Sequence, residues 1–281
     1  MQASSRIGID LGGTNIRAAV LNNGSIYHLH SKRINARESS ENILQQVYSV
    51  VDPLYNSDIA SIGIGVPGLV DEKEQMVYDV VNIPAWNKIS LQEILEQKYK
   101  CPVFIDNDAN CFAFGEYLFG KGKGYSSMAG ITLGTGLGCG LIINEKIYSG
   151  RNGGAGEFGM MPYLGHTYEY FASGQFFRNK YNIDGEEVFI NAGNGDKVSL
   201  EMYKEFGEHL ANAILAIQFA IDPELIVIGG ALKNAFPFYS DSMYQQLKTF
   251  PYQQAVHHLT IEISSLENAA ILGASTLYLN H

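Results

Sequence analysis

Two glycine-rich turns of the same design constrain the fold of this chain more than any other feature. The first spans residues 10–15 (DLGGTN) and the second spans residues 132–138 (TLGTGLG). Each follows a short apolar stretch, at 6–9 and 128–131, and each precedes a second apolar stretch that ends at an Asn-containing turn. Both therefore predict the same unit of strand, glycine turn, strand, tight turn and strand. Because glycine lets backbone N–H groups face a ligand, the two turns together predict a clamp for nucleotide phosphates.

The residues expected to contact the nucleotide in these turns are Asp10, Gly12, Gly13, Thr14, Asn15, Thr135 and Gly136. Asp10 ends its strand immediately before the glycines, where a carboxylate can hold Mg²⁺ beside the phosphates. Either turn alone is also consistent with an ordinary β-hairpin that happens to contain glycine. The occurrence of two such turns favours phosphate contact.

The rest of the chain alternates between helix and strand signals. Apolar periodicity predicts helices over 40–56, 90–99, 109–119, 199–221 and 268–278, and buried strands over 58–66, 102–105 and 225–228. Ser90, with Glu93 three residues later, has the pattern of a capping box, and Ser199 is the expected cap of the long helix. This alternation predicts an α/β architecture, and its repetition predicts a duplicated lobe with the ligand between the lobes.

Polar side chains follow the apolar strand at 102–105. The segment 106–110 (DNDAN) therefore lies where open α/β sheets bind ligands, beyond the carboxyl end of a strand. Phosphoryl transfer to a hydroxyl needs a base at such a place, and Asp108 is the residue expected to act as that base. Asn107 is the adjacent hydrogen-bonding group for sugar hydroxyls. The alternative is that Asp108 and Asn110 only cap the following helix.

Further candidates for ligand contact are less specific. The glycine-rich segment 150–159 surrounds Glu157, whose carboxylate would accept hydrogen bonds from vicinal hydroxyls. Glu169 is a second candidate, and the alternative for it is an exposed acid on an amphipathic helix. The indole of Trp86 would either stack on a pyranose ring or pack between lobes. Gly229 and Gly230 follow a strand and would let a purine lie on the backbone, but such glycine pairs are common.

Composition excludes several classes of protein. The formal net charge of −10 argues against nucleic acid as the main partner. No apolar run is long enough to span a bilayer, and the N-terminus shows no basic-then-apolar leader, so no membrane association is expected. Cys101, Cys111 and Cys139 form no CxxC pair, which favours reduced thiols and a cytoplasmic location.

Together, these motifs resemble the ROK family of sugar kinases and repressors, within the actin-like ATPase superfamily of hexokinases. The matching runs are DLGGTN at 10–15, GVPG at 65–68, NIPAW at 82–86, DNDAN at 106–110, TLGTGLG at 132–138, GGAGEFG at 153–159 and DPELIVIGG at 222–230. The resemblance implies a two-lobed actin-like ATPase (ribonuclease H-like) fold, with mixed β-sheets flanked by helices. It also implies a first lobe at 1–107 with a C-terminal helix at about 268–281, and a second lobe at 108–267.

The same resemblance implies roles for individual residues. Asp108 would be the catalytic base, and Gly229 and Gly230 would contact the adenosine. The residues implied to contact the sugar are Gly68, Asn82, Asn107, Glu157 and Glu169. A homodimer is a further expectation at the level of the family.

The chain also departs from the family pattern. Members typically carry a His after the Glu-x-Gly and then a Cys-rich loop that binds a structural zinc. Here that His position is Met160, and residues 161–169 contain no cysteine. One histidine without a thiolate cannot form a four-coordinate site, so we expect no structural zinc. His166 is then expected to be a surface or sugar-proximal residue. The nine residues before Asp10 leave no room for the DNA-binding module of the family's repressors, so no such module is expected.

The sequence thus predicts a kinase that moves the γ-phosphoryl of ATP, with Mg²⁺, to a hexose hydroxyl, with the 6-hydroxyl of glucose as the first choice. One alternative keeps the chemistry and changes the acceptor to fructose, mannose, an N-acetylhexosamine or a β-glucoside. The other is a non-catalytic sugar sensor. The presence of both Asp108 and Asp10 argues against the sensor, which needs neither a base nor a magnesium carboxylate.

Overall fold

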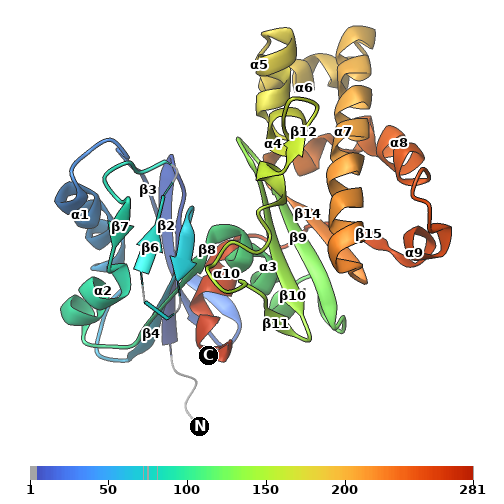
Figure 1. The fold of residues 1–281 in the computed structure, drawn as a ribbon. Helices are drawn as coiled ribbons and strands as arrows, with labels where there is room; N and C mark the ends of the chain where they lie inside the picture. The colour runs from blue at the N-terminus through green and yellow to red at the C-terminus, as the bar shows by residue number, and fades with distance from the viewer. Residues whose placement is uncertain (1–4, 72, 75, 81, 281) are drawn as a thin grey trace. The chain divides into compact units, whose positions relative to one another are not determined.

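The computed structural model describes residues 5–71, 73–74, 76–80 and 82–280, which divide into two compact units (Figure 1). Unit 1 takes its residues from 1–124, 140–155 and 265–281, and unit 2 consists of 125–139 and 156–264. Unit 1 includes the C-terminal segment that the sequence assigns to the first lobe. It also includes residues 108–124 and 140–155, which the sequence-based division assigns to the second lobe.

The first sheet has the strand order β3-β2-β1-β4-β8. Its strands are β1 (Ser5–Leu11), β2 (Asn15–Asn22), β3 (Ser25–Arg33), β4 (Ile59–Val66) and β8 (Val103–Asn107). The first three strands form the predicted antiparallel meander, and β4 and β8 then extend it in parallel from β1. Unit 1 also contains a small sheet of β5 (Leu69–Asp71), β6 (Met76–Tyr78) and β7 (Lys88–Ile89).

Four α-helices accompany the first sheet among the described residues: α1 (Ser40–Val51), α2 (Leu91–Tyr99), α3 (Asp108–Phe119) and α10 (Ala269–Ser275). The C-terminal helix α10 packs directly against the backbone of the sheet. A Cβ atom at Gly63 would lie 1.7 Å from the Ala274 carbonyl oxygen, so only glycine permits this contact. The short helix η3 (Leu277–Leu279) follows α10.

The second sheet has the strand order β11-β10-β9-β14-β15. Its strands are β9 (Ser127–Leu133), β10 (Leu137–Ile143), β11 (Lys146–Ile147), β14 (Leu225–Gly229) and β15 (Thr260–Ile263). As in the first sheet, an antiparallel pair lies on one side and parallel strands lie on the other. The same order in both halves confirms the predicted duplication and the mixed α/β fold.

All the helices of unit 2 in the described part of the chain follow the second glycine turn. They are α4 (Tyr168–Phe171), α5 (Gln175–Tyr181), α6 (Gly185–Gly193), α7 (Lys197–Ile221), α8 (Phe236–Leu247) and α9 (Gln253–His258), with the short helices η1 (Phe158–Met160) and η2 (Ala231–Ala235). A hairpin of β12 (Pro162–Tyr163) and β13 (His166–Thr167) precedes α4.

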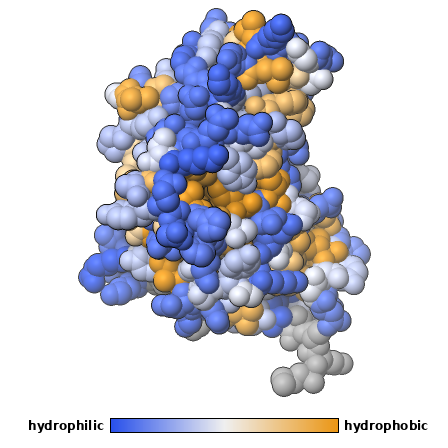
Figure 2. Space-filling model, turned by 90° about the vertical axis from the view of Figure 1, so that its right-hand side faces the viewer, coloured by the Kyte–Doolittle hydropathy of each residue, from blue (hydrophilic) through white to orange (hydrophobic). Residues whose placement is uncertain are grey.

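The surface carries some hydrophobic residues. Figure 2 shows hydrophobic surface among hydrophilic side chains. Phe219 and Tyr252 are among the most exposed large hydrophobic residues, at 62% and 69%.

Of the two predicted helix caps, Ser90 is the N-cap residue of α2, whereas Ser199 is not the cap of α7. The Ser90 side chain makes no capping hydrogen bond, because its hydroxyl donates to the sulfur of Met76 instead. Helix α7 begins at Lys197 rather than at 199, and its cap is Asp196, whose carboxylate accepts from the Ser199 N–H at 2.8 Å. A carboxylate placed three residues before a free N–H caps a helix as well as a hydroxyl does.

Candidate active site

Three parallel strands of unit 1 end in the residues that the sequence singles out. The register pairs Asp10 with Gly65 and Gly65 with Asp106, so these residues form a row across β1, β4 and β8. Asp106 is 4% exposed, and its Oδ1 accepts from Asn107 N at 2.7 Å and from Asn110 Nδ2 at 2.8 Å. The row therefore lies at the carboxyl edge of the sheet, where α/β proteins bind ligands.

Helix α3 starts from this row and presents Asp108. Its cap is Asn107, whose Oδ1 accepts from Ala109 N at 2.8 Å and from Asn110 N at 3.3 Å. The capping role that the sequence left open for Asp108 and Asn110 thus belongs to Asn107. Asp108 is the first residue of the helix and is half-buried, and its Oδ1 accepts from Ala109 N at 2.9 Å.

The predicted sugar contacts of unit 1 lie close to the predicted catalytic and phosphate residues. Asn107 Nδ2 donates to the Gly68 carbonyl oxygen at 3.3 Å, which joins these two candidates. A Cβ atom at Gly13 would lie 2.6 Å from Cγ of Asn82, so the Asn82 side chain packs on the first glycine turn. Within that turn, Gly12 N donates to Asn15 O at 2.9 Å.

The strand-edge row is strongly acidic. The Cys111 thiol lies beneath it, and burial raises its pKa well above the usual range, with further contributions from the carboxylates of Asp106, Asp108 and Asp10. Gly65 allows this crowding, since a Cβ atom there would lie 3.1 Å from Cys111 Sγ. The thiol therefore stays protonated and does not compete as a nucleophile.

Asp10 is bonded to a compensating cation. Its Oδ2 accepts from Arg17 Nη2 at 2.5 Å, and its side chain is 14% exposed. No cluster of three or more His, Cys, Asp or Glu residues that could hold a metal occurs in the described part of the chain. One carboxylate fits a Mg²⁺ ion that arrives with a nucleotide, because such ions take most of their ligands from phosphates and water.

The second glycine turn is held by the segment that follows α4. Gly134 N donates to Gly136 O at 3.0 Å within the turn, and Gly174 N donates to Gly134 O at 2.8 Å. The Ser173 hydroxyl donates to Thr135 O at 3.1 Å. The backbone of this turn is therefore fixed on one side by residues 173–174.

Glu169 lies against the same turn. Its Oε2 accepts from Leu137 N at 3.0 Å, and its Oε1 accepts from Gln175 Nε2 at 3.3 Å. A Cβ atom at Gly136 would lie 2.4 Å from Glu169 Oε2. The interpretation of Glu169 as an exposed acid on an amphipathic helix is therefore wrong, because the carboxylate is half-buried and bonded to the turn.

Glu157, the other predicted sugar acid, is coupled electrostatically to Glu169. Burial raises the pKa of the Glu157 carboxyl, although part of the side chain faces solvent, and the Glu169 carboxylate raises it further. The structure thus brings the two acids of unit 2 into one neighbourhood. Two like charges held close together are a common sign of a binding site.

A cavity of about 770 Å³ opens beside the second glycine turn. Its lining includes Gly134, Thr135, Gln175, Phe177, Arg178, Asp184, Phe189, Tyr203, Ala231 and Leu232. Gly229 and Gly230 do not line it. Gly230 has φ +80°, and a Cβ atom there would lie 2.2 Å from Leu133 O, so this glycine instead turns the chain toward Ala231.

Sequence reasoning missed the cavity residues contributed by α5 and α6. Both helices have fewer than ten residues, too few to show clear periodicity, and aromatic residues such as Phe177 and Phe189 gave no motif. Asp184 is the N-cap of α6, and its carboxylate bonds Arg178 at 2.9 Å. An Asp at this place is a local sequence signal for the start of a helix, from which α6 could have been predicted.

Two secondary expectations are also resolved. Trp86 is fully buried in the core of unit 1, so the sugar-stacking interpretation of its indole is wrong, and the ring packs within that unit. His166 is an exposed surface residue, as expected, and its ring stacks on Tyr170 at 4.0 Å.

Comparison with known proteins decides the family. The ROK family model matches residues 6–281. The chain belongs to the ROK family. Among the relatives of this ROK protein, a glucokinase of Streptomyces coelicolor is 30% identical over 263 residues, which cover 81% of this chain and 82% of the relative. A xylose repressor of Bacillus subtilis is 28% identical and matches 100% of this chain but 78% of its own length.

A solved structure confirms the fold. The ROK family glucokinase of Streptomyces griseus, in complex with glucose and AMPPNP, superposes with a TM-score of 0.84 at 27% identity, covering 97% of this ROK chain and 98% of that protein. The predicted actin-like ATPase fold is thus correct. Within the described residues, no helix combines the length and apolar character that a membrane crossing requires.

Proposed function

We propose that this ROK protein is an ATP-dependent sugar kinase that phosphorylates a hexose hydroxyl, with the 6-hydroxyl of glucose as the first candidate. The observation that carries the proposal is the acidic row at the strand ends, from which α3 presents Asp108 beside Asn107 and Gly68. The sequence similarity of the chain to a glucokinase of Streptomyces coelicolor supports the same proposal.

In this proposal, Asp108 is the catalytic base. Its carboxylate takes the proton of the attacking hydroxyl as the new O–P bond forms, and ADP leaves with the electrons of the broken bond. Asn107, Gly68 and Asn82 contact the sugar from unit 1. Mg²⁺ bound with ATP would neutralise charge on the phosphate oxygens, and Asp10 is the residue that would hold it.

Unit 2 would bind the nucleotide and complete the recognition of the sugar. Thr135 and Gly136 would contact the phosphates in the second turn, as Gly12, Gly13, Thr14 and Asn15 would in the first. The cavity beside Thr135 has the size and the aromatic lining that a nucleobase needs, and it reaches Ala231 just after Gly230. Glu157 and Glu169 would accept hydrogen bonds from ring hydroxyls.

A screen for ADP release tests the proposal. The purified chain is assayed with ATP and Mg²⁺ against glucose, fructose, mannose, N-acetylhexosamines and a β-glucoside, and the phosphorylated carbon is identified by NMR. Turnover that is fastest with glucose and yields the 6-phosphate supports the full proposal. Faster turnover with another sugar replaces only the acceptor. Tight sugar binding without turnover on any of them would contradict the kinase and favour a sensor.

Two further expectations are part of the same proposal. We place the reaction in the cytoplasm, and we expect the chain to act on small molecules rather than on nucleic acid. The assembly is proposed to be a homodimer, and sedimentation velocity across a concentration series measures it.

A further inference from the structure

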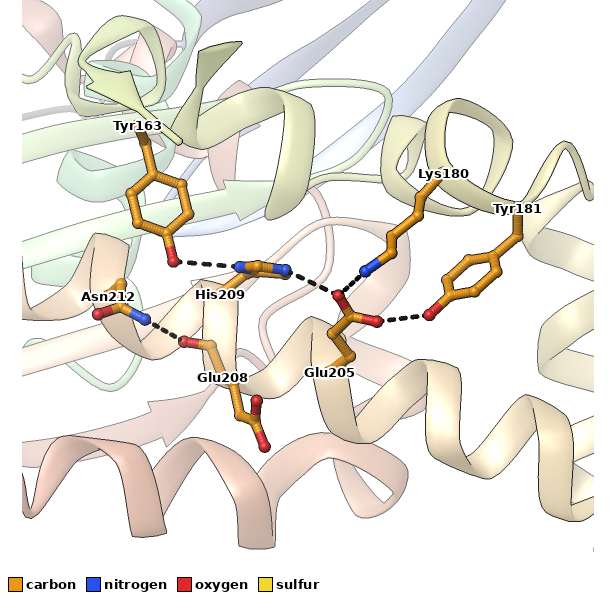
Figure 3. A network of polar contacts seen from close by, with 7 residues as sticks. All are labelled: Tyr163, Lys180, Tyr181, Glu205, Glu208, His209 and Asn212. Carbon is orange, nitrogen blue, oxygen red and sulfur yellow. Dashed lines mark hydrogen bonds and ion pairs between the residues drawn. The ribbon is translucent and has the colours of Figure 1, made fainter. Parts of the chain in front are cut away.

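A polar relay joins the hairpin β12–β13 to helices α5 and α7 in unit 2 (Figure 3). The Tyr163 hydroxyl lies 3.1 Å from His209 Nδ1, and His209 Nε2 lies 3.3 Å from Glu205 Oε1. Glu205 also accepts hydrogen bonds from Lys180 and Tyr181, at the end of α5. His209 therefore connects the hairpin to both helices.

The protonation of His209 suits this relay. Burial lowers its pKa, and the neighbouring Glu205 offsets only part of that effect. A neutral imidazole can donate from Nε2 to Glu205 while Nδ1 accepts from the Tyr163 hydroxyl, which satisfies both ring nitrogens. With His209 only 9% exposed, loss of either partner leaves a buried polar atom without a bond.

Ring packing ties the same hairpin to α4. Tyr163 stacks on Tyr168 at 4.5 Å and meets Phe171 edge-on at 5.5 Å, and Phe171 in turn contacts the His209 ring at 4.8 Å. Helix α4 has only four residues and lies between this aromatic cluster and the second glycine turn. Its position thus depends on tertiary contacts, because so short a helix has little stability of its own.

Glu169 lies on α4, directly after Tyr168 and two residues before Phe171. Its carboxylate accepts from Leu137 N and from Gln175 Nε2, the latter at the start of α5. The relay through Glu205 fixes the far end of α5 as well. Glu169 lies on α4, and its partner Gln175 lies on α5. Both helices are joined to His209, α4 by ring packing and α5 through Glu205.

We propose that His209 is a positioning residue that, through Tyr163, holds α4 so that the Glu169 carboxylate stays in place to bind the sugar. The inference rests on the proposed function, because Glu169 is taken as a sugar contact. His209 itself touches no reacting atom. It acts by fixing the element that carries the contact.

Four variants test this role: two single variants, their combination and one rescue variant. Tyr163→Phe keeps the ring and removes the hydroxyl. In His209→Gln the longer side chain carries its amide to the place of Nε2, so a donor for Glu205 remains but the acceptor at the place of Nδ1 is lost. Each should raise the hexose KM about threefold to tenfold, the usual effect of one buried hydrogen bond, with kcat and the ATP KM near wild type. The double variant should be no worse than either single variant, since both remove one interaction. His209→Asn, whose amide oxygen can still accept from Tyr163, should recover most of the hexose affinity.

The matched control is Asn212→Ala. Asn212 lies one turn further along α7 and donates to the Glu208 carbonyl oxygen at 2.7 Å, outside the relay (Figure 3). This variant should keep the wild-type hexose KM. A rise in its KM equal to that of Tyr163→Phe would overturn the inference, because α7 would then be generally sensitive.

Amide hydrogen exchange gives a readout that needs no activity. Protection of the Leu137 N–H, which donates to Glu169, should fall in Tyr163→Phe, while protection of the Ile9 N–H in unit 1 should stay constant. An unchanged Leu137 amide would overturn the positioning role even if the wild-type chain is an active kinase. A wild-type chain that phosphorylates no sugar would instead refute the proposed function, and the exchange experiment would still decide whether His209 positions Glu169.

Discussion

At the scale of the residue, the two acids of unit 2 differ in what holds them. Glu169 has two hydrogen-bond partners, whereas Glu157 has a pKa that burial and the nearby Glu169 carboxylate raise. A carboxylate kept charged near another carboxylate costs stability unless a ligand supplies donors. Sugar hydroxyls are such donors. We therefore expect the Glu157 carboxylate to lower the stability of the ligand-free protein and to strengthen binding of the sugar.

Glu157→Gln tests this exchange. In the wild type, burial raises the native pKa of Glu157 above that of the unfolded chain, so the native state binds more of this proton than the unfolded state between the two values, and the stability linked to Glu157 declines as pH rises over that range. The variant lacks this decline, and its thermal midpoint relative to wild type should therefore increase from pH 4.5 to pH 7.5. Its hexose KM should rise about tenfold or more, because a bond to a charged acceptor is lost. A parallel pH dependence of both midpoints would contradict the assignment.

At the scale of the element, the second glycine turn contains residues proposed to contact phosphate, and it bonds Glu169, which is proposed to contact the sugar. A Cβ atom at Gly136 would meet Glu169 Oε2 at 2.4 Å, whereas a Cβ atom at Gly134 would have no neighbouring atom within 4 Å. In this proposal, a side chain added at Gly136 would disturb both the phosphate turn and Glu169. A side chain added at Gly134 would leave Glu169 in place.

Gly136→Ala should push Glu169 away from Leu137 N and raise the hexose KM about tenfold. Gly134→Ala is the matched control, since it adds the same methyl group to the same turn where there is space. Steady-state kinetics with hexose and ATP varied separately make the comparison. Equal hexose KM values in the two variants would show that Glu169 does not bind the sugar from its present position.

The turn after β14 depends on glycine for two reasons. Gly230 has φ +80° and approaches the Leu133 carbonyl oxygen, while Gly195 has φ +81° with open space around it. Gly230→Ala should lower the free energy of unfolding by about 1–3 kcal/mol, and Gly195→Ala should lower it by less, because only the first adds a collision to the strain. Urea denaturation of both variants measures the difference, and equal losses would mean that the contact with Leu133 relaxes freely.

The elements that the sequence predicted well are those with a local cause. Both meanders follow from a glycine turn between apolar strands, and α7 follows from a long apolar stripe. The helices α5 and α6 escaped prediction because they are short and depend on tertiary contacts. The Ser90 side chain does not cap α2, because its hydroxyl donates to the sulfur of Met76. Of the candidate site, the residues in glycine or acid motifs could be named from sequence. Cavity side chains such as Phe177 and Phe189 come from the short helices α5 and α6, whose packing no local pattern encodes.

At the scale of the whole molecule, duplication gives each half a pair of parallel strands and a glycine-rich turn at a strand end. The first half supplies the acids Asp10 and Asp108, and the second supplies the cavity and Glu169. The two halves have the same strand order, so they differ in the residues at their strand ends rather than in topology. Those residues give each half its own proposed role. We expect the proposed kinase to need Mg²⁺ with its nucleotide and no resident metal.

Metal removal tests that statement. Dialysis against EDTA followed by addition of Mg²⁺ should restore full activity, because residues 161–169 offer one histidine and no thiolate. Elemental analysis of the purified protein accompanies the assay. About one tightly held zinc per chain, with activity that Mg²⁺ alone does not restore, would contradict the expectation.

The most direct test of the central claim is the turnover of Asp108→Asn with the preferred hexose, measured beside hexose binding by calorimetry. Removing the base while keeping its shape should lower kcat by about a hundredfold or more and leave the hexose Kd within a few fold of wild type. A variant that binds hexose and turns over at a near-normal rate would show that Asp108 is not the base.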